Sequence, residues 1–173
     1  MHTALIESLK PLLIQQKLHV AAAESITCGM LQSALGSISG SSEYLEGGLT
    51  AYNLQQKFSL LHIDYQHAQS VNCVSQQVAE QMAEQVCLLF ACDIGLATTG
   101  YAEPNKAHHI AIPEAYIAIC HRHKLEISCV HNAYVTGKDL NRKQMQAYVT
   151  QRILQALLDY LTHRNHIITM HQY

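Results

Sequence analysis

Residues 20–29 read Val20-Ala21-Ala22-Ala23-Glu24-Ser25-Ile26-Thr27-Cys28-Gly29, and this stretch decides the fold. Its first four residues are small and apolar, which predicts a short buried β-strand. Residues 30–35 then resume a helical spacing of apolar side chains, so we expect a helix after the polar turn. A strand, a small polar turn and a helix together place backbone N–H groups and a hydroxyl at a helix N-terminus.

Helical and strand patterns alternate outward from this stretch. We expect helices over residues 3–17, 54–61, 76–90 and 139–163, strands over 45–52 and 93–99, and a hairpin from 115–121 and 125–135. Pro11 should kink the first helix or start a second one, and Ser75 can cap the helix that follows it. The order predicts an α/β fold with a sheet between helices, mixed because of the late hairpin.

Composition bounds the class of protein. The 173 residues suit a single domain, which we place at residues 1–163 with a C-terminal tail at 164–173. Hydrophobic residues make up 49% of the chain and charged residues only 14%, so we expect a packed core and a surface partly covered in a homo-oligomer. The net charge of −2 and the lack of a basic cluster argue against nucleic acid as a partner.

The sequence also bears on compartment and cofactors. The N-terminal residues lack the pattern of a leader, and no apolar run is long enough for a membrane span, so we expect a cytoplasmic protein that is not bound to a membrane. Six cysteines without a CxxC pair indicate reduced thiols. Twelve histidines lie scattered or near the C-terminus, so we expect no bound metal.

Polar residues at three expected strand ends form a candidate site. Open α/β sheets bind ligands beyond the carboxyl ends of their strands, where Ser25, Tyr52 and Thr99 fall. Lys57 follows on the next helix, and a desolvated lysine can act as a base to serine. We therefore predict that Ser25 Oγ and Lys57 Nζ lie within hydrogen-bond reach. The alternatives are that Ser25 only caps a helix, or that Cys28 is the nucleophile.

Short motifs in order along the chain resemble those of one family. The resemblance to the CinA C-terminal family, the nicotinamide-nucleotide amidohydrolases, covers about residues 3–162. Its motifs are residues 23–29 (A-E-S-I-T-C-G against A-E-S-C-T-G-G), 40–52 (the G-S-S block ending in Tyr52), Lys57 five positions later, 74–83 (against V-S-E-E-V-A-x-x-M-A), 99–104 (T-G-Y-A-E-P against T-G-I-A-G-P), and Gly137 with Arg142.

The resemblance implies a three-layer α/β/α sandwich with a mostly parallel sheet. It also implies a deamidase that converts nicotinamide mononucleotide, a small nucleotide with a linear carboxamide, to nicotinate mononucleotide and ammonia, with no cofactor. Ser25 would be the nucleophile, Lys57 its base and Tyr52 a further catalytic residue. Substrate would be bound by Thr27, Cys28, Gly29, Gly40, Ser41, Ser42, Thr99, Gly100 and Arg142.

Four positions depart from the family pattern. Cys28 replaces a glycine and would be costly at positive φ, Leu54 replaces an asparagine, and Glu103 replaces a second glycine. Glu114 adds a carboxylate that would repel a phosphate if it lay near one. The second hypothesis is therefore a catalytically degenerate relative that binds a nucleotide-like ligand or a protein and does no chemistry.

Overall fold

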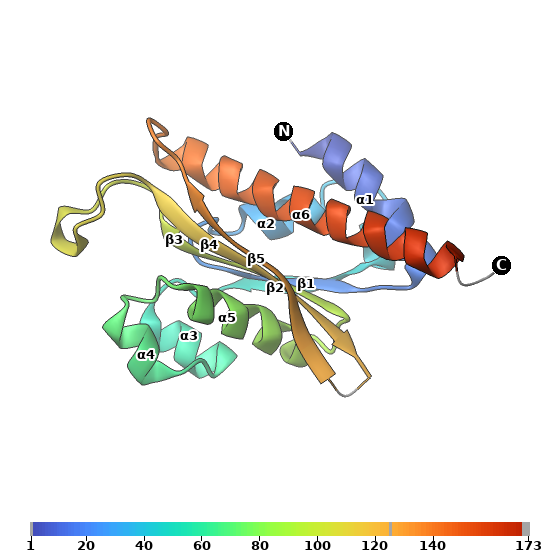
Figure 1. Cartoon of the computed structure of the whole chain (residues 1–173), viewed down its shortest axis with the longest axis horizontal. Coiled ribbons are helices and arrows are strands. Elements are labelled where there is room, and N and C mark those ends of the chain that lie inside the picture. Colours follow the sequence, from blue (N-terminus) through green and yellow to red (C-terminus); the bar gives the residue numbers. More distant parts are fainter. Residues whose placement is uncertain (1, 125, 171–173) are drawn as a thin grey trace.

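A five-stranded mixed sheet lies between two layers of helices in the computed structural model, which describes residues 2–124 and 126–170 (Figure 1). The strands are β1 (Val20–Glu24), β2 (Leu45–Thr50), β3 (Ile94–Tyr101), β4 (Glu114–His123) and β5 (Glu126–Thr136), in the spatial order β2-β1-β3-β4-β5. β1 pairs in parallel with β2 and β3, whereas β4 pairs antiparallel with both β3 and β5. β1, β2, β3 and β5 thus run in one direction, and the predicted mixed, mostly parallel sheet is confirmed.

The helices divide between the two faces of the sheet. One layer holds α1 (Thr3–Gln16), α2 (Met30–Leu35) and α6 (Arg142–Met170), and the other holds α3 (Leu54–Leu61), α4 (Tyr65–Ser70) and α5 (Gln76–Leu89) (Figure 1). Two short 3₁₀ turns, η1 (Ser41–Glu43) and η2 (Lys106–His108), lie in loops. Helix α6 ends seven residues beyond the expected boundary, so most of the predicted tail is helical, and residues 171–173 lie outside the described residues. Helix α1 continues through Pro11 as one element, and α4 was not predicted.

Two details explain how α5 packs onto the sheet. Ser75 Oγ accepts a hydrogen bond from the Val78 N–H at 3.2 Å, so the predicted cap fixes where the helix begins. Gly95 in β3 faces this helix, and a Cβ there would collide with the carbonyl oxygen of Ala83. The missing side chain therefore lets α5 approach the strand closely.

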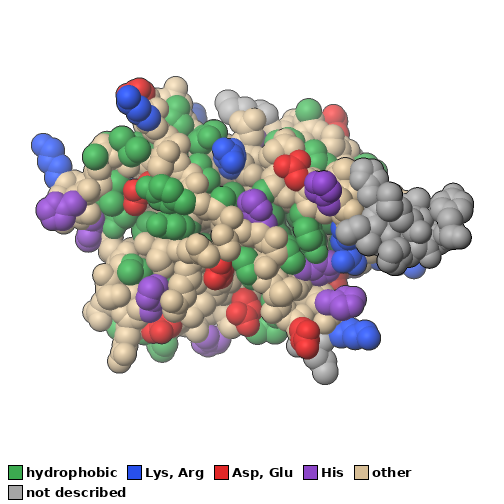
Figure 2. Space-filling model, in the orientation of Figure 1, with side chains coloured by type: hydrophobic (Ala, Val, Ile, Leu, Met, Phe, Trp, Pro, Cys, Tyr) green, Lys and Arg blue, Asp and Glu red, His purple; other side chains and the backbone are tan. Residues whose placement is uncertain are grey.

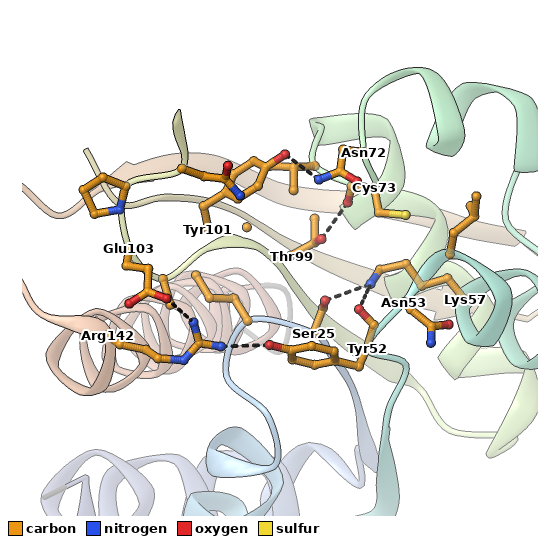
Figure 3. Close-up of a pocket in the computed structure, with 17 residues that line it drawn as sticks. Ser25, Tyr52, Asn53, Lys57, Asn72, Cys73, Thr99, Tyr101, Glu103 and Arg142 are labelled. Atoms are coloured by element: carbon orange, nitrogen blue, oxygen red, sulfur yellow. Dashed lines mark hydrogen bonds and ion pairs between the residues drawn. The ribbon is translucent and has the colours of Figure 1, made fainter. Parts of the chain in front are cut away.

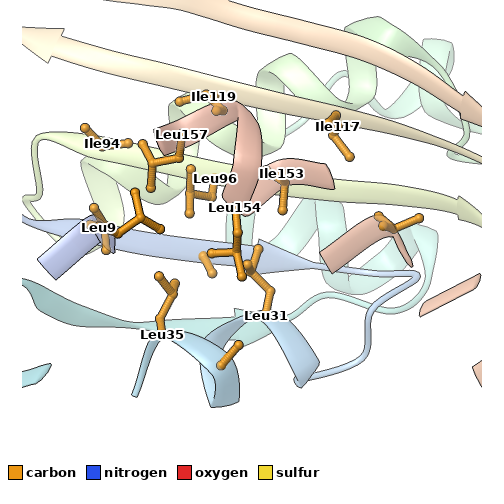
Figure 4. Close-up of a cluster of buried hydrophobic side chains, with 14 of the residues drawn as sticks. Leu9, Leu31, Leu35, Ile94, Leu96, Ile117, Ile119, Ile153, Leu154 and Leu157 are labelled. Carbon is orange, nitrogen blue, oxygen red and sulfur yellow. The ribbon is translucent and has the colours of Figure 1, made fainter. Parts of the chain in front are cut away.

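Apolar side chains fill the space on both faces of the sheet. On the α6 face, Ile153, Leu154 and Leu157 pack over Leu96 and Ile117 (Figure 4). On the α5 face, small residues of the strands, such as Ala21 and Ala23, meet the helix side chains Met82 and Val86. The sheet is thus buried on both sides, which explains why its strand β1 reads as an unbroken apolar run.

The described surface carries few charges. Lys and Arg side chains lie at separate places over the face shown in Figure 2, with acidic side chains between them. No helix in the described part of the chain combines the length and the apolar character that a membrane crossing requires.

Candidate active site

A cavity of about 380 Å³ opens beyond the carboxyl ends of β1, β2 and β3. Three neighbouring parallel strands end at this edge of the sheet, and each is followed by a segment that contributes to the cavity wall. The residues that line it are Ser25, Ile26, Tyr52, Asn53, Leu54, Lys57, Asn72, Cys73, Val74, Thr99, Gly100, Tyr101, Ala102, Glu103, Pro104, Asn105 and Arg142. The edge of the sheet predicted from the sequence is thus the edge that holds a cavity.

A serine and a lysine meet on the floor of this cavity. Lys57 Nζ lies 2.8 Å from Ser25 Oγ, which confirms the predicted convergence of the two groups (Figure 3). The same nitrogen donates to the carbonyl oxygens of Ala51, at 2.7 Å, and Tyr52, at 3.4 Å. Lys57 is only 1% exposed and Ser25 7%, so the pair is almost fully removed from water.

Burial makes the neutral form of Lys57 more accessible than in water. Burial lowers the pKa of its amine from 10.5 to about 8, and the nearby Cys73 thiol acts weakly in the opposite direction. Its contacts at Nζ are a hydroxyl and two carbonyls, with no carboxylate among them. When neutral, the amine can donate its two N–H groups to the carbonyls and accept the proton of the Ser25 hydroxyl.

A buried carboxylate anchors the turn that carries Ser25. Glu24 is fully buried, and its Oε2 accepts the N–H groups of Gly29 at 2.9 Å and Leu31 at 3.0 Å, while Oε1 accepts that of Gln32 at 2.9 Å. The Thr27 hydroxyl also donates to Oε2. Glu24 therefore ties strand β1 to the first turn of α2, and its side chain is fully used in doing so. The sequence analysis assigned it no role, although a glutamate that ends an apolar strand was the available signal.

Three side chains form a bridge at the outer end of the cavity. Arg142, the first residue of α6, donates to the Tyr52 hydroxyl at 2.8 Å and to Glu103 Oε1 at 3.0 Å (Figure 3). The three come from the segments that follow β2 and β3 and from α6, so this outer wall joins distant parts of the sequence. Tyr52 and Arg142 were predicted site residues, and both line the cavity.

The remaining predicted residues divide into two groups. Thr99 and Gly100 line the cavity at the end of β3, and the Thr99 hydroxyl donates to the Cys73 carbonyl at 2.7 Å. Thr27, Cys28 and Gly29 lie outside its lining, which corrects their assignment to substrate binding. Thr27 points inward to Glu24 and Thr98, because the turn folds over the buried carboxylate rather than toward the cavity.

The Gly/Ser loop is also misplaced by the sequence analysis. Gly40, Ser41 and Ser42 precede β2, so they lie at the amino ends of the strands, opposite the cavity, where Gly40 packs against Lys10. Glu114 likewise does not line the cavity. Its carboxylate accepts a hydrogen bond from the Tyr134 hydroxyl at 2.6 Å. Motif order alone did not reveal at which end of a strand each loop would lie.

Sequence reasoning missed one wall of the cavity. Asn72 and Cys73 come from the turn after α4, and Asn72 Nδ2 donates to the Tyr101 hydroxyl at 2.7 Å (Figure 3). These residues stand in loops without a periodic pattern, so no signal in the sequence placed them together. Among the described residues, no group of three or more His, Cys, Asp and Glu side chains is arranged to hold a metal ion.

Comparison with known proteins assigns this chain to a family. The family model of the CinA C-terminal domain matches residues 2–161. This chain belongs to that family. A CinA-like protein of Flavobacterium psychrophilum is 40% identical over 112 residues, and a competence-damage inducible protein of Streptococcus pyogenes is 36% identical over 115 residues.

Solved CinA superfamily structures share the fold. The one from Escherichia coli covers 91% of this chain and 89% of its own, with a TM-score of 0.81 and 25% identity. The competence damage-inducible protein A from Klebsiella pneumoniae covers 93% and 97%, with a TM-score of 0.83 and 21% identity. The two sequence relatives are longer proteins: the matches span 66% and 64% of this CinA-family chain but 27% of each relative.

Proposed function

We propose that the chain is a CinA-type amidohydrolase that uses Ser25 as nucleophile and Lys57 as base on the carboxamide of a nicotinamide nucleotide. The observation that carries the proposal is the 2.8 Å contact between Ser25 Oγ and Lys57 Nζ inside a cavity, with a lysine pKa of about 8. A base works best when its pKa lies near the working pH. The family resemblance makes nicotinamide mononucleotide the first substrate to test.

The contacts support a two-step hydrolysis. Neutral Lys57 takes the hydroxyl proton while Ser25 Oγ attacks the amide carbon, forming a tetrahedral intermediate. Protonated Lys57 then gives that proton to the leaving nitrogen, so ammonia departs and an ester remains on Ser25. Water, deprotonated by the same amine, attacks the ester, releases the carboxylate and restores the hydroxyl.

The developing oxyanion also needs a hydrogen-bond donor. The N–H of Ile26 follows the nucleophile directly, and Ile26 lines the cavity. Within the described residues this N–H has no hydrogen-bond acceptor. We assign it to the oxyanion, because donors that are fixed before the reaction stabilise charge that appears only in the transition state.

The alternative of a catalytically degenerate relative explains the Ser25–Lys57 pair, the dyad, less well. Ligand binding alone does not require a hydrogen bond between a lysine and a serine that are both almost fully buried, and burying an ammonium without a carboxylate partner is unfavourable. The environment of Lys57 has that cost, while its contact with Ser25 has a direct catalytic use. We therefore favour an enzyme.

The proposal is tested by measuring ammonia released from nicotinamide mononucleotide, with mass spectrometry of the product. Ser25→Ala should lower kcat at least about 10³-fold with little change in ligand affinity, since the nucleophile contributes in the transition state. Ser59→Ala, an exposed serine on α3, is the matched control and should retain full activity. Equal turnover by the unmodified protein and Ser25→Ala would overturn the serine mechanism.

A further inference from the structure

Few charged side chains line the cavity, and each of them contacts other groups of the protein. Of the described residues that line it, Lys57, Glu103 and Arg142 carry the side chains of the Lys, Arg, Asp and Glu types. Lys57 Nζ is engaged by Ser25 and two backbone carbonyls. Arg142 is engaged by Glu103 and Tyr52, so its guanidinium is neutralised by a carboxylate in direct contact.

Tyr52 fixes the distance between the dyad and this ion pair. Its carbonyl oxygen faces Lys57 Nζ, whereas its hydroxyl accepts from Arg142, so its ring lies between the two (Figure 3). A ligand whose amide reaches Ser25 therefore extends along the tyrosine ring, and its far end meets Arg142 and Glu103. That far end determines which ligands the cavity accepts.

We infer that Glu103 selects against a phosphate at the far end of the substrate, so that the cavity prefers a pyridine-carboxamide riboside to its 5′-monophosphate. The inference rests on the proposed amidohydrolase and moves its preferred substrate from the nucleotide to the corresponding nucleoside. A phosphate dianion would have to displace the carboxylate from Arg142 and would then lie beside it, with like charges in contact. A ribose diol can accept from Arg142 and donate to Glu103 without breaking the pair.

Exposure to solvent limits how strongly Glu103 can disfavour a phosphate. The side chain of Arg142 is 47% exposed and that of Glu103 59%, so water and salt screen the pair. We therefore expect a preference of about ten-fold rather than exclusion, and a preference that shrinks as ionic strength rises.

The test compares nicotinamide riboside with nicotinamide mononucleotide by isothermal titration calorimetry, in a Ser25→Ala background so that no turnover occurs. Glu103→Gln keeps the size of the side chain and removes its charge. It should tighten binding of the mononucleotide about ten-fold and change the riboside less than about three-fold. Glu114→Gln is the matched control, because Glu114 is a nearby carboxylate that also contacts a tyrosine hydroxyl but does not line the cavity.

The outcomes separate the two proposals. Tighter binding of the mononucleotide than of the riboside while Glu103 is intact would overturn the inference, as would equal shifts in Glu103→Gln and Glu114→Gln. Binding with the expected preference but no ammonia release by the protein with Ser25 would overturn the hydrolase and leave the preference standing. Failure of both ligands to bind any variant would overturn both.

Discussion

The β1–α2 turn and the β2–α3 segment each bury one ionisable side chain, and they treat it in opposite ways. Glu24 is surrounded by three backbone N–H groups and a hydroxyl, all of which stabilise the carboxylate. Lys57 faces two carbonyls and one hydroxyl, with no opposite charge in contact. The first side chain is fully used in holding the turn, whereas the second has a lowered pKa and contacts a hydroxyl at the cavity.

The difference shows how to separate a structural buried charge from a reactive one. Both residues are almost completely buried, so burial alone does not distinguish them. What distinguishes them is the set of partners: Glu24 accepts four hydrogen bonds that all hold the turn, whereas Lys57 Nζ contacts the Ser25 hydroxyl beside the cavity and burial lowers its pKa to about 8. Four predictions, made on three substitutions, test this contrast and its surroundings, from the largest expected effect to the smallest.

The largest effect should come from removing the base. Lys57→Met should lower kcat/KM for the amide at least about 10³-fold, because proton transfer and the leaving-group proton are both lost. In the unmodified protein, kcat/KM should rise about ten-fold per pH unit below pH 8 and level off above it, since the pKa of Lys57 is about 8. A rate that stays flat from pH 6 to about 9 would contradict a lysine base.

The second effect should come from removing the Glu24 carboxylate, which anchors the turn after β1. Glu24→Ala should lower the free energy of unfolding by about 3 kcal/mol, because four donors, two of them buried and two part-buried, lose their acceptor together. Chemical denaturation measures the loss. Glu43→Ala, which removes an exposed carboxylate that pairs with Lys10, is the control and should change stability by less than about 0.5 kcal/mol. A loss as small as the control's would show that the turn does not depend on Glu24.

The third effect is a gain in the free energy of unfolding rather than a loss. Because the folded pKa of Lys57 is lower than its ordinary value of 10.5, the unfolded chain binds the proton more tightly, and this group's contribution to stability rises between about pH 8 and 10.5. The difference between a pKa of 10.5 and one of about 8 corresponds to about 3 kcal/mol. Lys57→Met removes that penalty but leaves the carbonyls of Ala51 and Tyr52 without their donor, so the net gain at pH 7 should be about 2 kcal/mol. The gain should vanish above pH 10.5. Exposed Lys143→Met is the control, and a destabilised Lys57→Met at pH 7 would argue against an unfavourable buried charge.

The smallest effect should come from the turn itself. Cys28 has φ 52°, in the left-handed region, so the expected cost of a side chain there is present although the residue lies outside the cavity. Cys28→Gly should raise the free energy of unfolding, measured by chemical denaturation, by about 0.5–1 kcal/mol and leave the activity unchanged. Cys28→Ala keeps the strain and should give no gain. Loss of ammonia release in both variants would instead favour a cysteine nucleophile.

The fold followed from the sequence because its main signals are local. The apolar run before Ser25 and the cap at Ser75 each mark an element where the structure has one. Helix α4 was missed because its six residues, Tyr65–Ser70, have no apolar repeat. The last helix exceeded its expected end because residues 164–170 contain no stop signal such as glycine or proline.

The site was only partly predictable for a different reason. Ser25, Lys57 and Thr99 could be placed because strand ends converge in an α/β sheet. The direction of a side chain within a turn depends on tertiary contacts, so Thr27 was assigned to the wrong side of its turn. The partners of Arg142 come from residues 39 and 90 positions away in the chain, a pairing that no local pattern encodes.

The two ends of the cavity are built from different kinds of structural element. The dyad stands on strand ends and a buried helix, where most substitutions would disturb the fold. The far wall is made by an exposed loop residue, Glu103, and by the first residue of α6, Arg142. Under the proposed function, a replacement at Glu103 would change the far end of the ligand that the cavity accepts and would leave the serine and the lysine in place, so two chains with the same pair could bind different ligands.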